Sequence, residues 1–359
     1  MLFFDGLARV PTDFGPSAVT FGKFDAVHLG HLQVIGAVTD AARIRSLASV
    51  VITFDRNPLS VIAPERRPFD LVSRAQKREL LASAGLDAML ELQFDHQFSR
   101  QSPQAFIDDV LLCALGAQVV LVGPDCRFGA DGAGTFDTLV EAGARRGFEV
   151  ERLELFIADD HAPASSTRIR EKLADGDVAA AGRMLGRHPL VRSVVVHGQK
   201  RGRALGYPTA NLDPALEGFV PADGVYAGYL RIVAEGEAGE RTPGERMPAA
   251  ISVGNNPTFD GVPEKQVEAF VLDRTLDLYD LTVEVEFVER VRGMAKFDSL
   301  NDLIDQMADD TMRVRGILGV VGGSGGPPTG RNSSRSPAAS PTTTPTTPAE
   351  APAETPPEA

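Results

Sequence analysis

The sequence predicts an α/β domain, then a small antiparallel β-barrel closed by a helix, then a disordered C-terminal tail. Three observations lead to this architecture. Residues 1–186 alternate apolar runs with segments of helical spacing, the pattern of a parallel sheet covered on both faces. From about residue 190 the apolar runs are short and β-branched, and Gly, Pro or Asp separates them, which favours a barrel. Residues 321–359 carry almost no large apolar side chains.

The expected elements of the first half follow one another as a parallel sheet requires. Buried strands are predicted, in chain order, at residues 17–21, 48–54, 88–94 and 118–123. A helix is expected over residues 31–43 because apolar residues recur at helical spacing, at Leu32, Ile35, Val38 and Ala42. A second helix is expected over residues 103–115, where Pro103 occupies a tolerated first-turn position. Ligands of such sheets bind beyond the carboxyl ends of the strands.

The second half is expected to form the barrel. Its strands are predicted at residues 190–198, 224–233, 248–254, 266–273 and 281–289. The last run alternates apolar residues with Glu284 and Glu286, so one of its faces is expected to be exposed. The closing helix, residues 297–318, is expected to bury one face formed by Leu300, Leu303, Met307, Val314 and Leu318. We expect domains at residues 1–186 and 187–320, with the tail at 321–359.

Composition narrows the possible partners. The formal net charge of −13 argues against a nucleic-acid partner, because phosphate backbones attract basic surfaces. The chain has only two cysteines, Cys113 and Cys126, which fits a reducing compartment rather than a disulfide framework. No signal peptide and no apolar run of membrane-spanning length is expected. A soluble cytoplasmic protein without a membrane partner is therefore the expectation, and its oligomeric state stays open.

The stretch VTFGKFDAVHLGHL, residues 19–32, leads from a predicted strand through a turn into a helix. Such a junction presents backbone N–H groups and the positive helix end to an anion. His28 and His31 add side-chain donors, and Gly30 lets a phosphate approach the backbone. The pattern indicates a phosphate cradle, although two surface histidines at a helix start would give the same spacing.

The HLGH tetrapeptide resembles the HxGH signature of the nucleotidyltransferase superfamily, and SSTRIREKL, residues 165–173, stands where that superfamily has a second motif. With TFDRNP and VGPDCRFG between them, these motifs resemble the N-terminal half of bacterial bifunctional riboflavin kinase/FMN adenylyltransferases, the FAD synthetases. The resemblance covers residues 15–315. It implies a Rossmann-like domain that transfers AMP from ATP to FMN and releases pyrophosphate.

The resemblance also implies residue roles in this first site. Histidines 28 and 31 would be catalytic through the phosphates of ATP. The other ATP-binding residues would be Gly22, Phe24, Gly30, Ser165, Thr167, Arg168 and Arg170. The flavin-side residues would be Asn57, Asp125, Arg127 and Phe128. The chain departs from the family pattern at Ala26, where glycine is usual, at Arg56 and Asn57, where TFDPHP is usual, and at Cys126, where an aromatic residue is common.

A second site is predicted from HGQKRGRALGYPTANL, residues 197–212. Thr209 and Asn211 offer two neutral oxygens close together, which suits Mg²⁺ bound with ATP. GYPTANL and the later SVGNNPTFDG and VEAFVLD resemble the motifs of riboflavin kinase. That resemblance implies Glu268 as the general base for the ribityl hydroxyl. It also implies ATP contacts from Gly202, Gly206, Pro208 and Thr209, and flavin contacts from Phe270, Arg292 and Phe297.

The sequence therefore predicts an enzyme that converts riboflavin to FMN and FMN to FAD, with riboflavin, FMN and ATP as substrates and Mg²⁺ as cofactor. One alternative is a riboflavin kinase whose adenylyltransferase domain is degenerate, which the TFDRNP departure favours. Others are a non-catalytic flavin-binding protein and an HxGH transferase for another mononucleotide.

Overall fold

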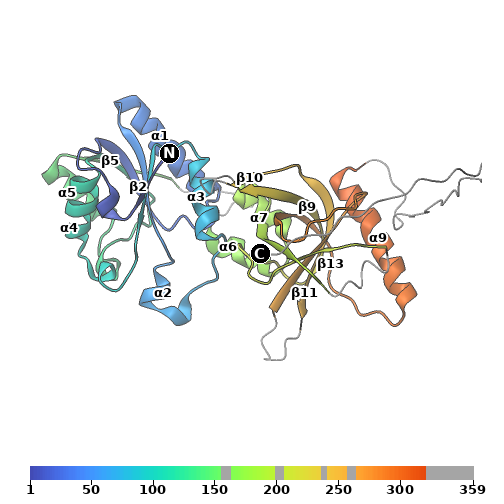
Figure 1. Cartoon of the computed structure of the whole chain (residues 1–359). Helices are drawn as coiled ribbons and strands as arrows, with labels where there is room; N and C mark the ends of the chain where they lie inside the picture. Colours follow the sequence, from blue (N-terminus) through green and yellow to red (C-terminus); the bar gives the residue numbers. More distant parts are fainter. Residues whose placement is uncertain (155–162, 199–205, 236–240, 257–263, 321–359) are drawn as a thin grey trace, which may run out of the picture. The chain divides into compact units, whose positions relative to one another are not determined.

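A parallel sheet and a closed barrel follow each other along the chain in the computed structural model (Figure 1). The structure describes residues 1–154, 163–198, 206–235, 241–256 and 264–320. The predicted tail lies outside these residues, and so does Gly202. Within them, no helix has the length and apolar character needed to cross a membrane.

Within residues 1–154 the sheet has six strands, all paired in parallel, in the order β1-β4-β3-β2-β5-β6. The strands are β1 Leu2–Asp5, β2 Ser17–Phe21, β3 Ala48–Phe54, β4 Ala88–Leu92, β5 Ala117–Val122 and β6 Glu149–Arg152. The four predicted strands are confirmed, whereas the short edge strands β1 and β6 were not predicted. From β2 the chain moves to β3 on one side and later returns to β5 on the other. Its order therefore reverses at β2, where sheets of this kind bind ligands.

Helices cover both faces of this sheet (Figure 1). The helices of residues 1–154 are α1 Leu29–Arg45, α2 Leu59–Ile62, α3 Arg74–Ala82, α4 Pro103–Ala105, its π-helical continuation η4 Phe106–Ala114, and α5 Phe136–Arg146, and all but α2 and α4 contribute buried residues to the clusters against the sheet. Short 3₁₀ turns are η1 Leu7–Arg9, η2 Pro64–Arg66, η3 Phe98–Arg100 and η5 Ala130–Gly132. Both predicted helices are present. The prediction that Leu32 belongs to the buried face of α1 is wrong, because Leu32 is 36% exposed. The other three predicted residues, Ile35, Val38 and Ala42, are buried.

In the described chain six antiparallel strands close a barrel in the order β9-β11-β12-β8-β7-β13, and β13 pairs back onto β9. The strands are β7 Leu190–Val196, β8 Ala210–Leu212, β9 Gly224–Glu235, β10 Arg241–Pro243, β11 Met247–Asn256, β12 Glu264–Val271 and β13 Thr282–Arg292. Strand β10 pairs with β9 outside the ring. Helix α9, Leu300–Leu318, follows the last strand and packs against β9, β11 and β13.

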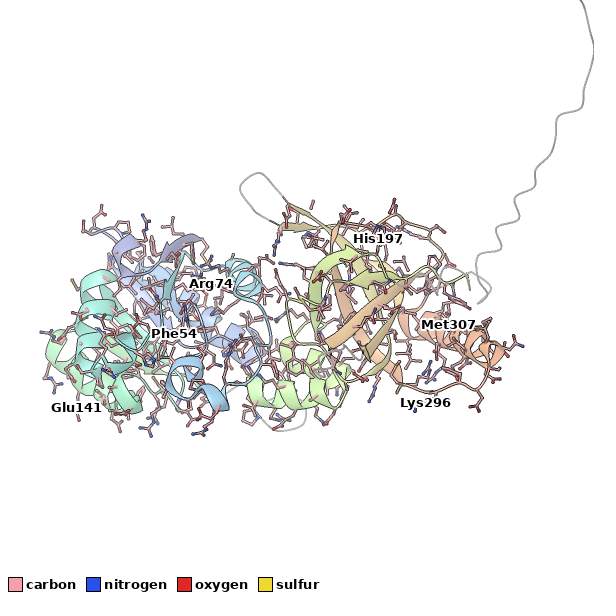
Figure 2. All side chains as sticks on the ribbon, turned by 60° about the horizontal axis from the view of Figure 1, so that its bottom comes forward. Phe54, Arg74, Glu141, His197, Lys296 and Met307 are labelled. Atoms are coloured by element: carbon pink, nitrogen blue, oxygen red, sulfur yellow. The ribbon has the colours of Figure 1, made fainter. Side chains whose placement is uncertain are left out.

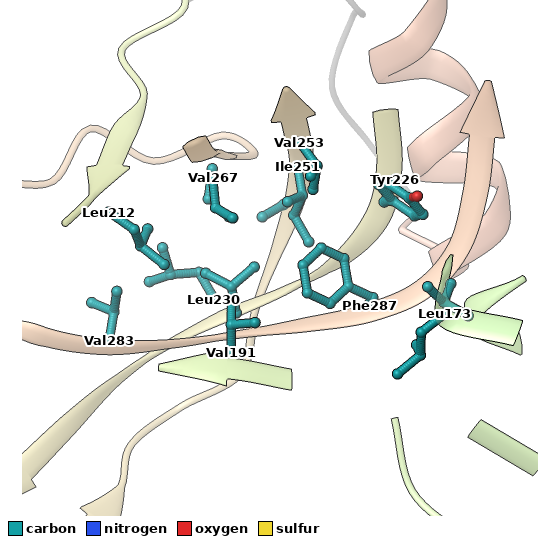
Figure 3. Packing of buried hydrophobic residues seen from close by; sticks show 14 of the residues in the cluster. Leu173, Val191, Leu212, Tyr226, Leu230, Ile251, Val253, Val267, Val283 and Phe287 are labelled. Carbon is teal, nitrogen blue, oxygen red and sulfur yellow. The ribbon is translucent and has the colours of Figure 1, made fainter. Parts of the chain in front are cut away.

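The barrel interior is filled by alternate residues of its strands (Figure 3). Phe287 and Val283 of β13 join Ile251 of β11 and Leu230 of β9 in one hydrophobic cluster. Two helices that precede the barrel, α6 Ser166–Ala174 and α7 Val178–Leu185, contribute to the same cluster. Sheet and barrel lie in one compact unit.

The polar face expected for the last strand is not exposed. Glu284 is 2% exposed and Glu286 is 6% exposed. Arg192 and Arg231 both pair with Glu284, and Arg246 pairs with Glu286. A buried carboxylate needs such partners, because an unpaired charge is costly to remove from water.

The apolar face predicted for the closing helix is correct in its second half. Val314 is buried, and Met307 and Leu318 pack against the same cluster. Leu300 is 58% exposed, because it is the first residue of α9 and lies before the turns that reach the barrel.

Candidate active sites

The first candidate site lies at the carboxyl end of β2, where the loop of residues 22–28 enters α1. His28 is the N-cap residue of α1, and His31 lies in the first turn. Their rings stack, with centroids 3.7 Å apart and planes 19° apart. Both Nδ1 atoms are buried and have no hydrogen-bond partner among the described residues. The two imidazoles therefore keep polar atoms available at the end of the helix that favours anions.

The turn before α1 is made by residues other than Gly30. Phe24, Ala26 and Val27 have positive φ values of 46°, 70° and 44°, whereas Gly30 lies within the first turn of the helix. The expectation of a glycine-bearing turn is therefore wrong for Gly30. The φ of Ala26 explains the family's usual glycine there, because glycine adopts the left-handed region at least cost. Phe24 also contacts His31, with ring centroids 5.0 Å apart.

Burial keeps both histidines neutral at pH 7. It lowers the pKa of His28 to about 4, and the positive charge of Arg187 adds to this effect. Burial also lowers the pKa of His31 well below its usual value, with further contributions from His28 and Arg187. A neutral imidazole has one donor and one acceptor nitrogen. Each ring can therefore donate a hydrogen bond without carrying a charge of its own.

We expect acid to destabilise the folded chain through His28. Its pKa is about 4 when folded and about 6.5 when unfolded, so the unfolded state binds more protons between these pH values. The free energy of unfolding should fall by about 2 kcal/mol between pH 7 and pH 5 through this group. Denaturant unfolding of the wild type and of His28→Ala at both pH values measures this. The variant should lose less stability on acidification, and equal losses would contradict the prediction.

The second motif is tied to the first by hydrogen bonds. Ser165 caps α6 by accepting a bond of 3.3 Å from the backbone N–H of Arg168. Ser166 Oγ donates to the backbone oxygen of Asp25 at 2.9 Å, so α6 begins against the loop that carries the histidines. Ser166 was not among the predicted ATP-binding residues, although it stands between two that were. Thr167 is exposed, and Arg168 also donates to the backbone oxygen of Pro163 at 2.8 Å.

Arg170 is already held by protein groups. It donates to the backbone oxygen of Phe69 at 2.6 Å and pairs with the carboxylate of Asp25. Burial raises the pKa of Asp25 although the neighbouring Arg170 lowers it. The structure therefore places Arg170 in the wall of the site, between the first loop and the segment before α3.

A pocket opens beside this loop. Its lining includes Lys23, Asp25, Asp55, Arg56, Asn57, Asp70, Ser73, Arg74 and Lys77. Phe54 and Arg74, at the end of β3 and the start of α3, are labelled in Figure 2. Arg56 pairs with Asp55, and the buried Lys77 donates to the backbone oxygen of Phe54. The sequence analysis did not predict Lys23 or Lys77 as site residues. Lys23 could have been found, because it lies within FGKFD, beside the predicted site.

The predicted flavin-side residues of the first site come from the loops that follow β3 and β5. Asn57 lines the pocket. Asp125 and Arg127 are exposed in the loop that follows β5. The ring of Phe128 is buried, and its centroid lies 5.5 Å from those of Phe21 and Phe106. Cys126 is partly buried, and this raises the pKa of its thiol to about 11.

The second candidate site lies where β8 pairs with β12. The backbone register places Asn211 opposite Glu268. Thr209 Oγ1 donates to Glu268 Oε2 at 3.2 Å. Asn211 Nδ2 donates to the backbone oxygen of Thr209 at 3.2 Å, and Gln266 Nε2 donates to Asn211 Oδ1 at 3.3 Å. The three predicted residues therefore form one hydrogen-bonded group, which Gln266 extends.

Backbone geometry explains how this group is held. Gly206 has a φ of +83° just before Pro208 and Thr209. At Gly198 an added Cβ would lie 2.4 Å from Asn211 Cγ. Gly198 is thus required for the position of the Asn211 amide, a role that sequence reasoning missed. A pocket adjoins the group and is lined by Pro208, Thr209, Ala210, Ala269, Arg274 and Tyr279, among others.

The predicted flavin residues of the second site lie on the side where α9 packs. Phe270 is largely buried and contacts Tyr207 edge to face, with centroids 5.1 Å apart. Arg292 forms a bidentate ion pair with Asp310 of α9 and lies 5.8 Å from the ring centroid of Phe297. Arg292 therefore joins α9 to the end of β13.

The oxygens of Thr209 and Asn211 fit a divalent metal ion that is bound together with phosphate. Asn211 Oδ1 accepts one hydrogen bond and has a second lone pair. Thr209 Oγ1 donates a hydrogen bond to Glu268 and accepts one of 3.4 Å from Asn211 Nδ2, which leaves one of its lone pairs available. Among the described residues no cluster of three or more His, Cys, Asp or Glu side chains could hold a metal. Neutral oxygens with phosphate and water are the surroundings that Mg²⁺ tolerates well.

Comparison with known proteins matches both halves of the chain. A family model described as FAD synthetase matches residues 10–168, and one described as riboflavin kinase matches residues 185–318. The bifunctional riboflavin kinase/FMN adenylyltransferase of Escherichia coli (strain K12) is 33% identical over 302 residues, covering 84% of this chain and 93% of that protein. The protein of the same name from Bacillus subtilis (strain 168) is 31% identical over 299 residues, covering 82% and 90%.

A solved structure has the same fold over both halves. The crystal structure described as a macrolide-efflux protein from Streptococcus pneumoniae matches with a TM-score of 0.75 at 33% identity. The match covers 88% of this chain and 98% of the other. The sheet and the barrel thus occur together in a related chain.

Proposed function

The chain belongs to the family of bacterial bifunctional riboflavin kinases/FMN adenylyltransferases. From this premise we propose which reaction each of its two sites catalyses. It is an enzyme that phosphorylates riboflavin to FMN with ATP and then transfers AMP from ATP to FMN, giving FAD and pyrophosphate. We assign adenylyl transfer to residues 1–186 and riboflavin phosphorylation to residues 187–320. Its two cysteines are free, which supports a cytoplasmic location.

In the kinase site, we assign Glu268 as the base that accepts the proton of the ribityl hydroxyl. The observation that carries this assignment is the hydrogen-bonded group of Thr209, Asn211 and Glu268 on two paired strands. The Thr209 hydroxyl orients one carboxylate oxygen and leaves the other for the substrate. Enzymes of this kind need a divalent metal, and we propose Mg²⁺, which would neutralise phosphate charge beside Thr209 and Asn211. Pro208 and the adjoining pocket would hold ATP.

In the adenylyltransferase site, we assign His28 and His31 as neutral donors to the α-phosphate. Negative charge grows on that group as the FMN phosphate attacks it. The two stacked imidazoles lie at the N-terminus of α1, and this arrangement supports a site that stabilises the charge without reorganising. The pocket lined by Lys23, Arg56 and Asn57 lies next to it and is proposed to receive substrate.

Labelled ATP tests this function in one assay. The enzyme is incubated with riboflavin, Mg²⁺ and ATP carrying ³²P at either the γ or the α position, and the flavins are separated by chromatography. The γ label should enter FMN, and the α label should enter FAD alone. Accumulation of labelled FMN without FAD would instead support the kinase with a degenerate adenylyltransferase domain.

Gly198→Ala should lower riboflavin phosphorylation selectively. The new Cβ would overlap the Asn211 amide, and a displacement of about 1 Å in such a site can cost on the order of 10²-fold in rate. We expect FMN formation to fall roughly 10- to 100-fold while adenylylation of supplied FMN stays within about twofold. Gly316→Ala is the matched control, because nothing lies within 4 Å of its added Cβ. An unchanged kinase rate in Gly198→Ala would show that the Asn211 position is unimportant.

A further inference from the structure

The loop before the first histidine directs two backbone carbonyls toward Arg187 through an unusual conformation. Ala26 and Val27 both have positive φ, and Val27 is β-branched, for which this region is a genuine outlier. Such a conformation persists only where surrounding groups hold it. Immediately after these two residues comes His28, whose ring lies in the site. Whatever holds the two carbonyls therefore also sets the direction in which the chain enters α1.

Arg187 binds both carbonyls. Its Nη1 donates to the backbone oxygen of Val27 at 2.9 Å and to that of Leu185 at 3.3 Å, and its Nη2 donates to the backbone oxygen of Ala26. Arg187 lies between α7 and β7, about 160 residues away from the loop along the chain. One planar guanidinium thus joins the turn before α1 to the segment that leads into the barrel.

The neighbouring glycine lets this segment approach so closely. Gly186 ends α7 with a φ of +72°. An added Cβ there would lie 2.5 Å from Cδ2 of Leu29, the first residue of α1. The turn of Gly186 and Arg187 therefore packs directly against the start of the helix. This contact is a second observation, independent of the hydrogen bonds, that places the segment against the candidate site.

Arg187 brings a positive charge to this place and has no carboxylate partner among the described residues. Its hydrogen bonds there go to the three carbonyl oxygens. Burial lowers its pKa to about 10, so it remains charged at neutral pH. Arg187 lowers the pKa of both imidazoles, and His28 also lowers the pKa of His31. A buried cation beside two neutral imidazoles is suited to a site that receives phosphate.

We propose that Arg187 is a positioning residue for adenylyl transfer. It holds the Ala26–Val27 turn so that His28, His31 and the N-terminus of α1 face the phosphate together. The inference rests on the adenylyltransferase site proposed above. It places a residue needed for adenylyl transfer in the segment that begins the kinase half of the chain.

Kinetics of two Arg187 variants test this role. Arg187→Met removes all donors, and adenylylation of supplied FMN should fall 10- to 100-fold in kcat, with riboflavin phosphorylation within about twofold of the wild type. Arg187→Lys keeps a charge and can reach fewer carbonyls, so it should be intermediate. Arg183→Met, an exposed arginine in the last turn of α7, is the control and should resemble the wild type. Where Arg187→Met does not fold, Arg187→Lys decides, and wild-type adenylylation in that variant overturns the proposal.

A spectroscopic measurement separates positioning from a general structural role. In ¹⁵N-histidine spectra of the unliganded protein, Arg187→Met should raise the titration midpoints of His28 and His31, because one cause of their lowering is removed. Unchanged midpoints, or parallel loss of both activities, would overturn the proposal. A wild-type protein that makes FMN but no FAD would instead defeat the adenylyltransferase assignment itself.

Discussion

Glu268→Gln is expected to lower the rate of FMN formation by about 10²- to 10⁴-fold, the usual contribution of a general base. The amide keeps the size of the side chain and can still accept a hydrogen bond from Thr209. It cannot accept the proton of the ribityl hydroxyl. A primary alcohol is a weak nucleophile, so the loss falls on the chemical step and should appear in kcat.

The same variant should still convert supplied FMN to FAD at nearly the wild-type rate, because the histidines stand on another element of the fold. The matched control is Glu289→Gln, which changes an exposed glutamate of β13 in the same barrel. Initial rates from flavin chromatography measure both reactions. Equal loss of the two activities in Glu268→Gln would contradict separate sites. An unaltered kinase rate would show that Glu268 is not the general base.

His28→Ala should have the complementary effect. Removing one preorganised donor from a charge-stabilising site typically costs about 10²- to 10³-fold in kcat, and we expect FAD formation from FMN to fall by that much. The ring of His31 also loses its stacking partner, 3.7 Å away in the wild type. Phosphorylation of riboflavin should continue, so FMN should accumulate.

His96→Gln serves as the control, because His96 is exposed and lies outside both candidate sites. Its flavin profile should match that of the wild type. FAD formation by His28→Ala within about threefold of the wild type would be too small for a donor to the α-phosphate.

The hydrogen-bonded group of Thr209, Asn211 and Glu268 in the kinase site could be predicted because its residues lie within short motifs. Thr209 and Asn211 are two positions apart, so an extended chain points them to the same side. The partner strand could not be found from periodicity. Strand β8 is three residues long, and its register with Glu268 depends on a pairing across more than fifty positions.

Residues that act through distant partners escaped prediction. The pattern of β13 indicated an exposed face for Glu284, yet Arg192 and Arg231 from other strands bury it in ion pairs. Arg187 lies in a segment whose composition indicated only a domain boundary, because its carbonyl partners belong to a loop far earlier in the chain. The short edge strands β1 and β6 give too few residues for a clear pattern.

The central claim is that one chain holds two separate ATP-dependent sites, and a mixing experiment tests it most directly. Glu268→Gln and His28→Ala are combined in equal amounts with riboflavin, ATP and Mg²⁺, and the flavins are separated over time. The account predicts that FAD forms in the mixture, although each variant alone yields little or none. A mixture that forms no more FAD than the separate variants would contradict it.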